Sequence, residues 1–249
     1  MPFLIHALIR LPEPLSGFRE ALHLTGLAAG GGTPELFVFR EIGAVAVFVE
    51  SVTASPLQAE LLGYADVVER VAALATMLPV RYGSTAASEE ALLAMLSANH
   101  DPIVEALDRV EGRVEYSVRI LPPKEPSRIA GESGSDAVAS TPPLLVGESV
   151  YKQYLRAKYE AFRKDRLLAG EAEALRGCLT DAIRRLDPAM RFASLDSAGF
   201  MVDLAVLVHR SAQAGFGSVF EAFRATHPDR QLLVTGPWPP YNFANLTKA

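Results

Sequence analysis

The spacing of apolar positions in the first part of the chain predicts a small sheet accompanied by two helices. Residues 3–10 form one strand-like run, and residues 35–50 hold two more, broken at Ile42 as in a β-hairpin. Over residues 55–77 apolar side chains recur three and four positions apart, which is the repeat of a helix. A second helical pattern covers residues 88–112, so strands and helices occur together in this part of the chain.

The second part of the chain shows the patterns of four strands and two helices. Residues 113–120 alternate cleanly between apolar and polar, as in a strand that is buried on one face. The elements that follow are a long helix at 151–187, strands at 190–195 and 200–208, a helix at 213–225 and a strand at 230–236. Strand, helix, strand, strand, helix, strand is the order of ferredoxin-like folds, in which two helices back an antiparallel sheet.

These patterns predict an α+β protein of two domains. The N-terminal α+β domain covers residues 1–110, and the C-terminal domain, with the ferredoxin-like order, covers residues 111–249. Within the second domain, residues 122–145 are rich in proline, serine, glycine and charge, and hold few bulky apolar side chains. Such a segment buries too little surface to offset its ordering entropy, so we expect a flexible loop there.

Composition and charge narrow the possible functions. The chain has 249 residues, of which 49% are hydrophobic, with 24 lysines and arginines against 29 aspartates and glutamates. The net charge of −5 gives no support to nucleic-acid binding, which needs a concentrated positive field. The single cysteine, Cys178, favours a reducing compartment, and the sequence shows neither a signal peptide nor an apolar run of about 20 residues. We expect a cytoplasmic protein that binds neither nucleic acid nor a lipid membrane.

The residues that carry chemistry in known motifs predict no catalytic residue, no metal site and no cofactor. No P-loop, nucleophile elbow or metalloprotease helix occurs. The five histidines are scattered without the spacing of metal ligands. Cys178 lies within a predicted helix and is expected to be a packed thiol. Asp203 lies inside an apolar strand, where an edge position or a backbone partner explains it, with a general base as the alternative.

The stretch "LPVRYGST" stands out between the two N-terminal helices, because it combines Pro79, Arg81 and Gly83 in an apolar setting. Proline favours an extended path, and glycine permits a tight turn. Arg81 offers five donors in a fixed fork, so it could bind an anionic ligand or tie the linker to carbonyls or an acid. The three residues are candidates for an interaction site or a domain junction.

The segment "LLVTGPWPPYNF" contains the last predicted strand and sets three aromatic side chains, Trp238, Tyr241 and Phe243, among stiffening prolines. Either these rings fold back over the sheet, or they present a surface to a partner. Left exposed together, they would form a sizeable apolar patch. We therefore expect a clamp that crosses the domain junction with Trp238 largely buried, and Pro79 and Arg81 are its candidate partners there.

A basic amphipathic pattern marks the start of the long predicted helix. Lys152, Arg156 and Lys158 carry the charge, and aromatic and leucine side chains between them form an apolar stripe. Such a helix could dock on an acidic partner. Alternatively it packs on the sheet and leaves a solvated outer face.

Taken in order, several motifs resemble those of the gas vesicle protein F/L family. The resemblance rests on "LPVRYGS" ahead of "SEEALLAML", then "LDRVEGRVEYSVRI", then "AVLVHR", and finally "LLVTGPWPPYNF". It covers most of the chain from about residue 70 to residue 243. The final motif is highly specific.

This resemblance implies a non-enzymatic role. It implies an accessory or minor structural protein that is needed for gas vesicle formation and binds the small hydrophobic shell protein and other accessory gas vesicle proteins. It further implies two domains, the C-terminal one a modified ferredoxin-like fold, and a location at the gas vesicle, with the cytoplasm as the place of assembly. The alternative is a small-molecule-binding or enzymatic α+β domain that uses Arg81 and the C-terminal aromatic tail as a pocket.

Overall fold

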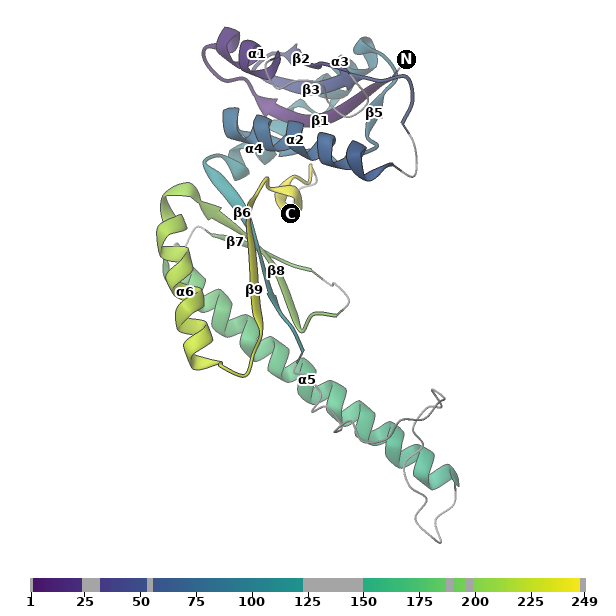
Figure 1. The fold of residues 1–249 in the computed structure, drawn as a ribbon, viewed down its shortest axis with the longest axis vertical. Coiled ribbons are helices and arrows are strands. Elements are labelled where there is room, and N and C mark those ends of the chain that lie inside the picture. Colours follow the sequence, from purple (N-terminus) through teal and green to yellow (C-terminus); the bar gives the residue numbers. More distant parts are fainter. Residues whose placement is uncertain are drawn as a thin grey trace.

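The computed structural model describes residues 2–23, 32–52, 56–122, 150–186, 190–195 and 199–246. Within these residues the chain forms two antiparallel sheets, each accompanied by helices (Figure 1). The predicted α+β class is therefore confirmed. Almost all of the predicted loop at 122–145 lies outside the described residues.

The first sheet has the strand order β2-β3-β1-β4, and β5 also pairs with β1. Its strands are β1 (Phe3–Arg10), β2 (Pro34–Phe39), β3 (Ile42–Phe48), β4 (Met77–Pro79) and β5 (Thr85–Ala86). Strands β1 and β3 are buried along almost their whole length. A near-continuous apolar run is typical of a strand that is covered on both faces, and both strands have such a run.

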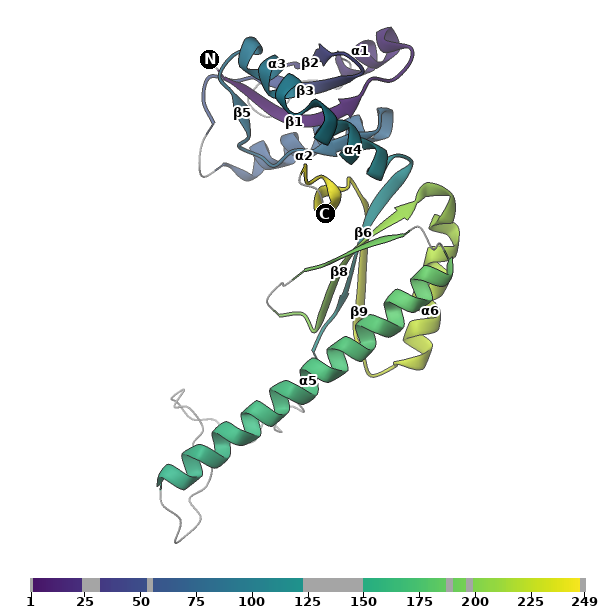
Figure 2. The ribbon, with the colours of Figure 1, turned by 180° about the vertical axis from the view of Figure 1, so that it is seen from behind.

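Helices cover the two faces of this sheet (Figure 2). They are α1 (Leu15–His23), α2 (Gln58–Leu74), α3 (Glu89–Ala98) and α4 (His100–Val110). Leu4, Ala7 and Ile9 of β1 pack with α1 and α2, whereas Ile5 and Leu8 pack with α3 and α4. The alternation of β1 slips at His6, where the pairing with β3 is irregular, so His6 and Ala7 do not follow the simple two-residue repeat.

The first half of the chain differs from the prediction at three places. The hairpin turns at Arg40, which has a φ of 54°, and Ile42 already belongs to β3. Helix α1 follows β1 in a stretch that shows no clear helical pattern. The stretch "MLPVRYGSTA" contains β4 and β5, because pairing with β1 holds these short segments in strand geometry, for example Pro79 opposite Ala7.

The second sheet has the strand order β7-β8-β6-β9, and all of its pairs are antiparallel. Its elements are β6 (Arg113–Ile120), α5 (Val150–Leu186), β7 (Arg191–Ser194), β8 (Val202–His209), the short 3₁₀ helix η1 (Arg210–Ala212), α6 (Gln213–Thr226) and β9 (Leu232–Trp238). Helices α5 and α6 contribute side chains to one apolar cluster with this sheet, among them Leu179 and Phe216. The chain order of these elements agrees with the prediction.

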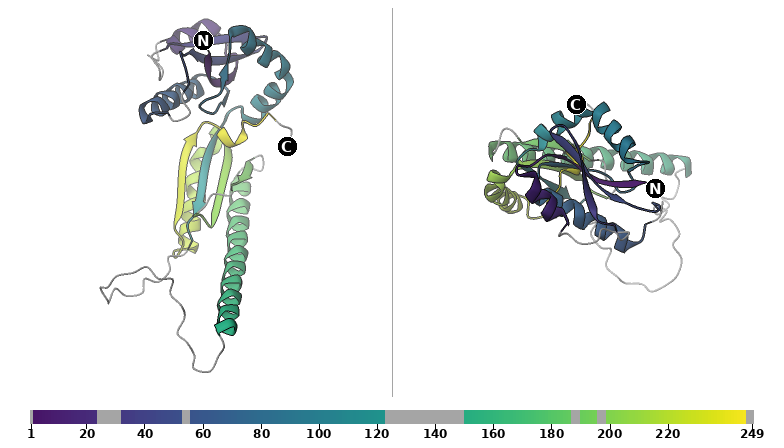
Figure 3. Two further views of the ribbon diagram at one scale, coloured as in Figure 1. Left: turned by 90° about the vertical axis from the view of Figure 1, so that its right-hand side faces the viewer. Right: turned by 90° about the horizontal axis from the view of Figure 1, so that it is seen from above.

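Helix α5 extends well beyond the second sheet (Figure 3). Leu175, Leu179 and Ile183 in its C-terminal part are buried against the sheet, whereas Tyr159 and Leu167 are 62% and 69% exposed. The part of α5 before residue 170 therefore projects away from the sheet. None of the described helices combines the length and the apolar character that are needed to cross a bilayer.

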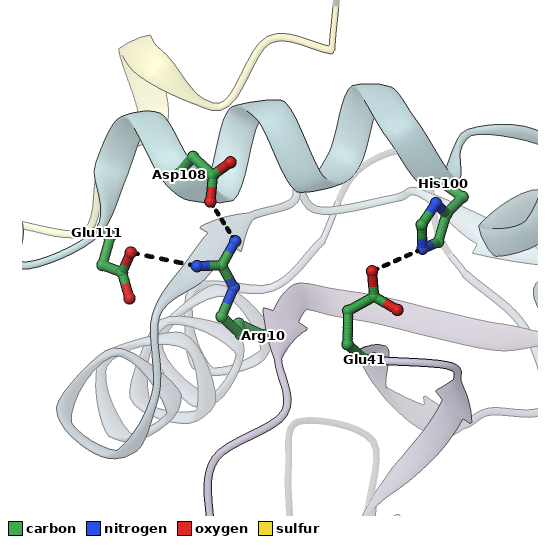
Figure 4. Close-up of polar contacts among 5 residues, drawn as sticks. All are labelled: Arg10, Glu41, His100, Asp108 and Glu111. Carbon is green, nitrogen blue, oxygen red and sulfur yellow. Dashed lines mark hydrogen bonds and ion pairs between the residues drawn. The ribbon is translucent and has the colours of Figure 1, made fainter.

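Ion pairs fix α4 to the first sheet, and β6 follows α4 directly (Figure 4). The Arg10 guanidinium at the end of β1 pairs with Asp108 and lies 3.1 Å from the Glu111 carboxylate. His100 Nε2 lies 3.1 Å from the Glu41 carboxylate at the hairpin, and the carboxylates of Asp101 and Glu41 raise the pKa of His100. These contacts add to the apolar packing of Ile103, Ala106 and Leu107, which holds α4 on the first sheet.

Candidate interaction site

The C-terminal tail lies between the two sheets (Figure 1). After β9 the chain passes through two prolines into the 3₁₀ turn η2 (Tyr241–Phe243), which contacts β4 and α4. The Phe243 side chain is only 7% exposed and belongs to an apolar cluster that includes Leu107 of α4 and Leu207 of β8. The Arg109 guanidinium also donates to the carbonyl oxygen of Asn245, 3.3 Å away. The tail thus contacts both halves of the chain.

A buried carboxylate holds the tail in place. Glu115 of β6 is 4% exposed, and its two oxygens accept from the backbone N–H of Asn242 at 2.8 Å and from the Asn242 side-chain amide at 2.6 Å. Burial raises the pKa of Glu115, whereas the two bonds from Asn242 act in the opposite direction. The alternating pattern of β6 assigns Glu115 to the polar face, and no local signal shows that the tail covers it there.

Gly236 allows the tail to pass close to β6. Its φ is 129°, in the region that favours glycine, and a Cβ atom there would lie 2.8 Å from the carbonyl oxygen of Glu115 and 2.9 Å from the Tyr116 ring. A side chain at position 236 would collide with β6. The glycine before the prolines therefore has a steric role as well as a conformational one.

Trp238 is 45% exposed, so the prediction that it is largely buried is wrong. It is the last residue of β9, an edge strand of the second sheet, and its indole Nε1 donates to the Thr235 hydroxyl at 3.3 Å. The chain enters the space between the sheets only after Trp238, so Phe243 takes the buried position. Tyr241 is 41% exposed, and burial of its hydroxyl together with the nearby Glu69 raises its pKa.

The stretch around Arg81 begins with β4 of the first sheet. Pro79 is buried in β4, which contacts η2, whereas Arg81 and Gly83 are exposed. The Tyr64 hydroxyl of α2 is within hydrogen-bonding distance of the carbonyl oxygens of Val80, at 2.5 Å, and of Ile5, at 3.0 Å. The structure therefore brings Pro79 close to the tail and leaves the Arg81 guanidinium without a hydrogen bond or ion pair within the described residues.

His6 is a buried residue that the sequence patterns do not single out. Its ring is fully buried and stacks on Tyr64 with 4.4 Å between the ring centroids, and Nδ1 lies 3.2 Å from the carbonyl oxygen of Leu4. Burial lowers the pKa of His6 to about 4, so the ring is neutral at pH 7. The cause of its burial is the irregular pairing in β1, which turns the ring toward α2.

A groove of about 530 Å³ opens where the two halves meet. We call it the junction groove. Two halves of the chain line it. The first half contributes Glu69 and residues 72–74 of α2, residues 75–77 after that helix, and Val110 at the end of α4. The second half contributes residues 112–114 at the start of β6, Arg210 after β8, and residues 237–240 of the tail. The Arg210 guanidinium donates to the carbonyl oxygen of Ala72 at 3.3 Å and so bridges the two halves. Trp238 lines this groove, and Arg81 does not.

The basic segment of α5 lies at the end of the helix that points away from the first sheet (Figure 3). Lys158 is exposed on the projecting part of the helix. The side chains of Lys152 and Arg156 lie outside the described part of the structure. The two alternatives for this segment, a docking face and a solvated outer face, therefore both stay open.

Two expectations about single residues are wrong. Asp203 lies in the interior strand β8, not at an edge, and its carboxylate accepts from Arg119 Nε at 3.1 Å across the sheet. An opposite charge on the neighbouring strand thus replaces the expected backbone partner. Cys178 is exposed on α5, because its side of the helix faces away from the sheet.

Among the described residues, no three His, Cys, Asp or Glu side chains are grouped to hold a metal ion.

Comparison with known proteins points to one family. The family model described as gas vesicle synthesis protein GvpL/GvpF matches residues 7–245. Gas vesicle protein F of Streptomyces sp. (strain CB03234) is 25% identical over 210 residues, which cover 81% of this chain and 84% of that protein. Gas vesicle protein L of the same strain is 24% identical over 239 residues, which cover 88% of this chain and 86% of that protein.

Solved structures show the same fold at low sequence identity. The crystal structure of the gas vesicle protein GvpF from Anabaena sp. PCC7120 superposes with a TM-score of 0.72 at 14% identity, and the match covers 99% of this chain and 97% of that one. GvpF from Microcystis aeruginosa gives a TM-score of 0.67 at 12% identity, covering 98% and 99%. Both likenesses extend over nearly the whole of each chain.

Proposed function

Because the chain belongs to the gas vesicle synthesis protein GvpL/GvpF family, we propose that it is an accessory or minor structural protein needed for gas vesicle assembly. It acts by binding the small hydrophobic shell protein and other accessory gas vesicle proteins. The observation that carries this proposal is the family match from residue 7 to residue 245, which includes both sheets and the tail. A location at the gas vesicle, with the cytoplasm as the place of assembly, follows from the same role.

The role is that of a binding protein without catalysis. The polar side chains that the fold buries most deeply serve the fold: Glu115 holds the tail, Asp203 pairs with Arg119, and His6 stacks on Tyr64. Each of them has a structural explanation. The alternative pocket of Arg81 and the tail has less support, because Arg81 does not line the groove that the tail forms.

We also assign two domains to the chain, residues 1–110 and residues 111–249. The second is a modified ferredoxin-like domain. Two observations support this assignment: the strand order β7-β8-β6-β9, and the position of α5 and α6 in one apolar cluster with that sheet. The extension of α5 beyond the sheet is the modification. With the boundary at the start of β6, Pro79 and Arg81 belong to the first domain and the tail belongs to the second. Pro79, Arg81 and the aromatic residues of the tail are therefore the candidates for the domain junction.

Deletion of the gene and imaging of the cells test the proposed role. We expect few or no gas vesicles in the deletion strain and their return when the gene is supplied again. In a second experiment the tagged protein is co-expressed with the shell protein and purified, and the shell protein is expected to co-purify. Normal vesicles in the deletion strain would contradict a role in assembly, and a failure to co-purify would contradict the shell protein as the partner.

A further inference from the structure

We propose that the junction groove binds an apolar peptide segment of a partner protein, and that this segment carries a carboxylate which pairs with Arg210. This inference rests on the proposed function, since it names the surface and the chemistry through which a partner is held. Three features of the groove support it: its shape, the apolar surface inside it, and its charge.

The groove is a rigid, preformed binding surface. One wall is the last turn of α2, and the other is the 237–240 segment, whose three prolines have a fixed φ and no backbone N–H. The Trp238 ring is oriented by its hydrogen bond to Thr235, and the chain before it is held against β6 at Gly236. Little conformational entropy is lost when a ligand enters such a groove, which favours binding.

Both walls expose apolar side chains to water. Leu74 is 40% exposed on α2, and Trp238 is 45% exposed on the tail. Met77 and Val110, which are buried, lie at the base. An apolar segment placed between the walls removes the indole and the leucine from water, and tryptophan is among the residues that contribute most to protein interfaces.

The charges in the groove favour an acidic occupant. Arg210 and Arg113 lie at the end formed by the second sheet, and Glu69 lies on α2. Arg210 is exposed, and its bond to Ala72 occupies one of five donors, so the guanidinium is held in place with donors left over. A carboxylate at this end of the groove therefore meets the Arg210 guanidinium. Arginine binds carboxylates in a planar, bidentate geometry.

Trp238 provides a direct readout, because it is the only tryptophan in the chain. The full-length protein is titrated with a capped apolar pentapeptide that contains one glutamate, and with the same peptide carrying glutamine or lysine instead. We expect a saturable shift of the emission to shorter wavelength with the glutamate peptide, and binding at least about tenfold weaker with the other two. Equal binding of the three peptides, or no saturable change with any of them, would overturn the proposal.

Variants of exposed residues test the groove with the shell protein. Leu74→Glu places an acid inside the groove, and Leu62→Glu, on the same helix and 58% exposed, places one away from it. Arg210→Gln removes the charge and keeps a donor for Ala72, with the exposed Arg185→Gln as its control. We expect Leu74→Glu and Arg210→Gln to reduce peptide affinity and shell-protein recovery at least about tenfold, and the two controls to leave both unchanged. Circular dichroism confirms that each variant is folded.

The outcomes separate this inference from the proposed function. If the shell protein co-purifies equally well with the wild type, Leu74→Glu and Arg210→Gln, the groove is not the binding site. Binding of the shell protein itself would still stand. Glutamate peptide that binds while shell protein fails to co-purify would support the groove and overturn the proposed partner. If compounds of a small-molecule library shift the Trp238 emission saturably and the peptides do not, the groove binds a different class of ligand.

Discussion

His6, Gly236, Glu115 and Phe243 show how single residues stabilise this fold. All four lie where two segments that are distant in the sequence come together. His6 contacts α2 from β1, and the other three position the tail against the second sheet and α4. Their roles depend on burial, so substitutions at these positions are expected to affect folding stability.

The neutral, buried ring of His6 is expected to make stability depend on pH. The pKa of His6 is about 4 in the folded protein and 6.5 in an ordinary setting, so the unfolded chain binds the proton more readily. The contribution of His6 to stability is complete above pH 6.5 and is lost as pH falls from 6.5 toward 4, by about 3 kcal/mol in total. Urea unfolding from pH 7 to pH 4 measures it.

A variant isolates the His6 contribution from that of other groups. In His6→Phe, which can still stack on Tyr64, the loss of stability between pH 6.5 and pH 4 should be about 3 kcal/mol smaller. His209→Gln, at an exposed histidine, should retain the wild-type dependence. An unchanged pH profile in His6→Phe would show that this ring does not titrate in the window.

Gly236→Ala is expected to destabilise the protein by roughly 2 kcal/mol or more. The alanine Cβ would meet backbone of β6, which cannot move aside, at a φ of 129° that is strained for any side chain. Gly217→Ala is the matched control, because Gly217 lies in α6 with nothing within 4 Å of its added Cβ. It should stabilise the protein by about 0.5–1 kcal/mol. Thermal unfolding measures both, and an equal effect of the two changes would argue against close packing at Gly236.

At the scale of elements, the second sheet and its helices follow the local patterns closely, and the exceptions have tertiary causes. Strands β4 and β5 are two or three residues long, and pairing with β1 holds them. Helix α5 packs on the sheet through only its C-terminal part, because the sheet is shorter than the helix. The projecting part leaves Tyr159 and Leu167 exposed.

If the basic residues of α5 dock on an acidic partner, and do not only form a solvated outer face, their charge is needed for binding. Reversing Lys152, Arg156 and Lys158 to glutamate should leave the circular dichroism spectrum and the melting temperature unchanged and weaken co-purification with the shell protein. Added salt should weaken it in the same way, since exposed charge pairs are screened. If neither the charge reversal nor the added salt lowers the recovery of shell protein, this helix is not an electrostatic docking face.

At the scale of the whole molecule, the tail and the hydrogen bonds of two arginines connect the two sheets. Phe243 lies in the apolar cluster shared by both halves, and Arg210 and Arg109 add bonds across the same region. The angle between the halves therefore depends on the last residues of the chain. The junction groove exists only while this angle is kept.

Phe243→Ala is expected to cost about 3–5 kcal/mol, the range for removing a buried aromatic ring, whereas Trp238→Ala should cost clearly less because the indole is 45% exposed. Urea unfolding followed by circular dichroism measures both, and small-angle scattering detects a change in the angle between the halves. A larger loss of stability in Trp238→Ala than in Phe243→Ala would show that the indole is the main contact of the tail.

The sequence by itself determined the kinds and the order of the elements of the second sheet and its helices, and the family. Apolar periodicity along β6, α5, β8 and α6 is a local property, because each residue's face follows from its position in a strand or helix. The motif that ends in "GPWPPYNF" identified the tail as distinctive for a related reason, since proline restricts the backbone and glycine widens its allowed conformations wherever they occur.

Only the tertiary structure decided which side chains the tail covers. Glu115 and Arg119 occupy equivalent polar positions of β6, yet Glu115 is buried by Asn242 and Arg119 pairs with Asp203. Trp238 and Phe243 have similar apolar character, and the path of the chain buries the second and not the first. Burial at such positions depends on contacts between segments far apart in the sequence, for example 127 positions for Glu115 and Asn242. Local patterns hold no information about these contacts.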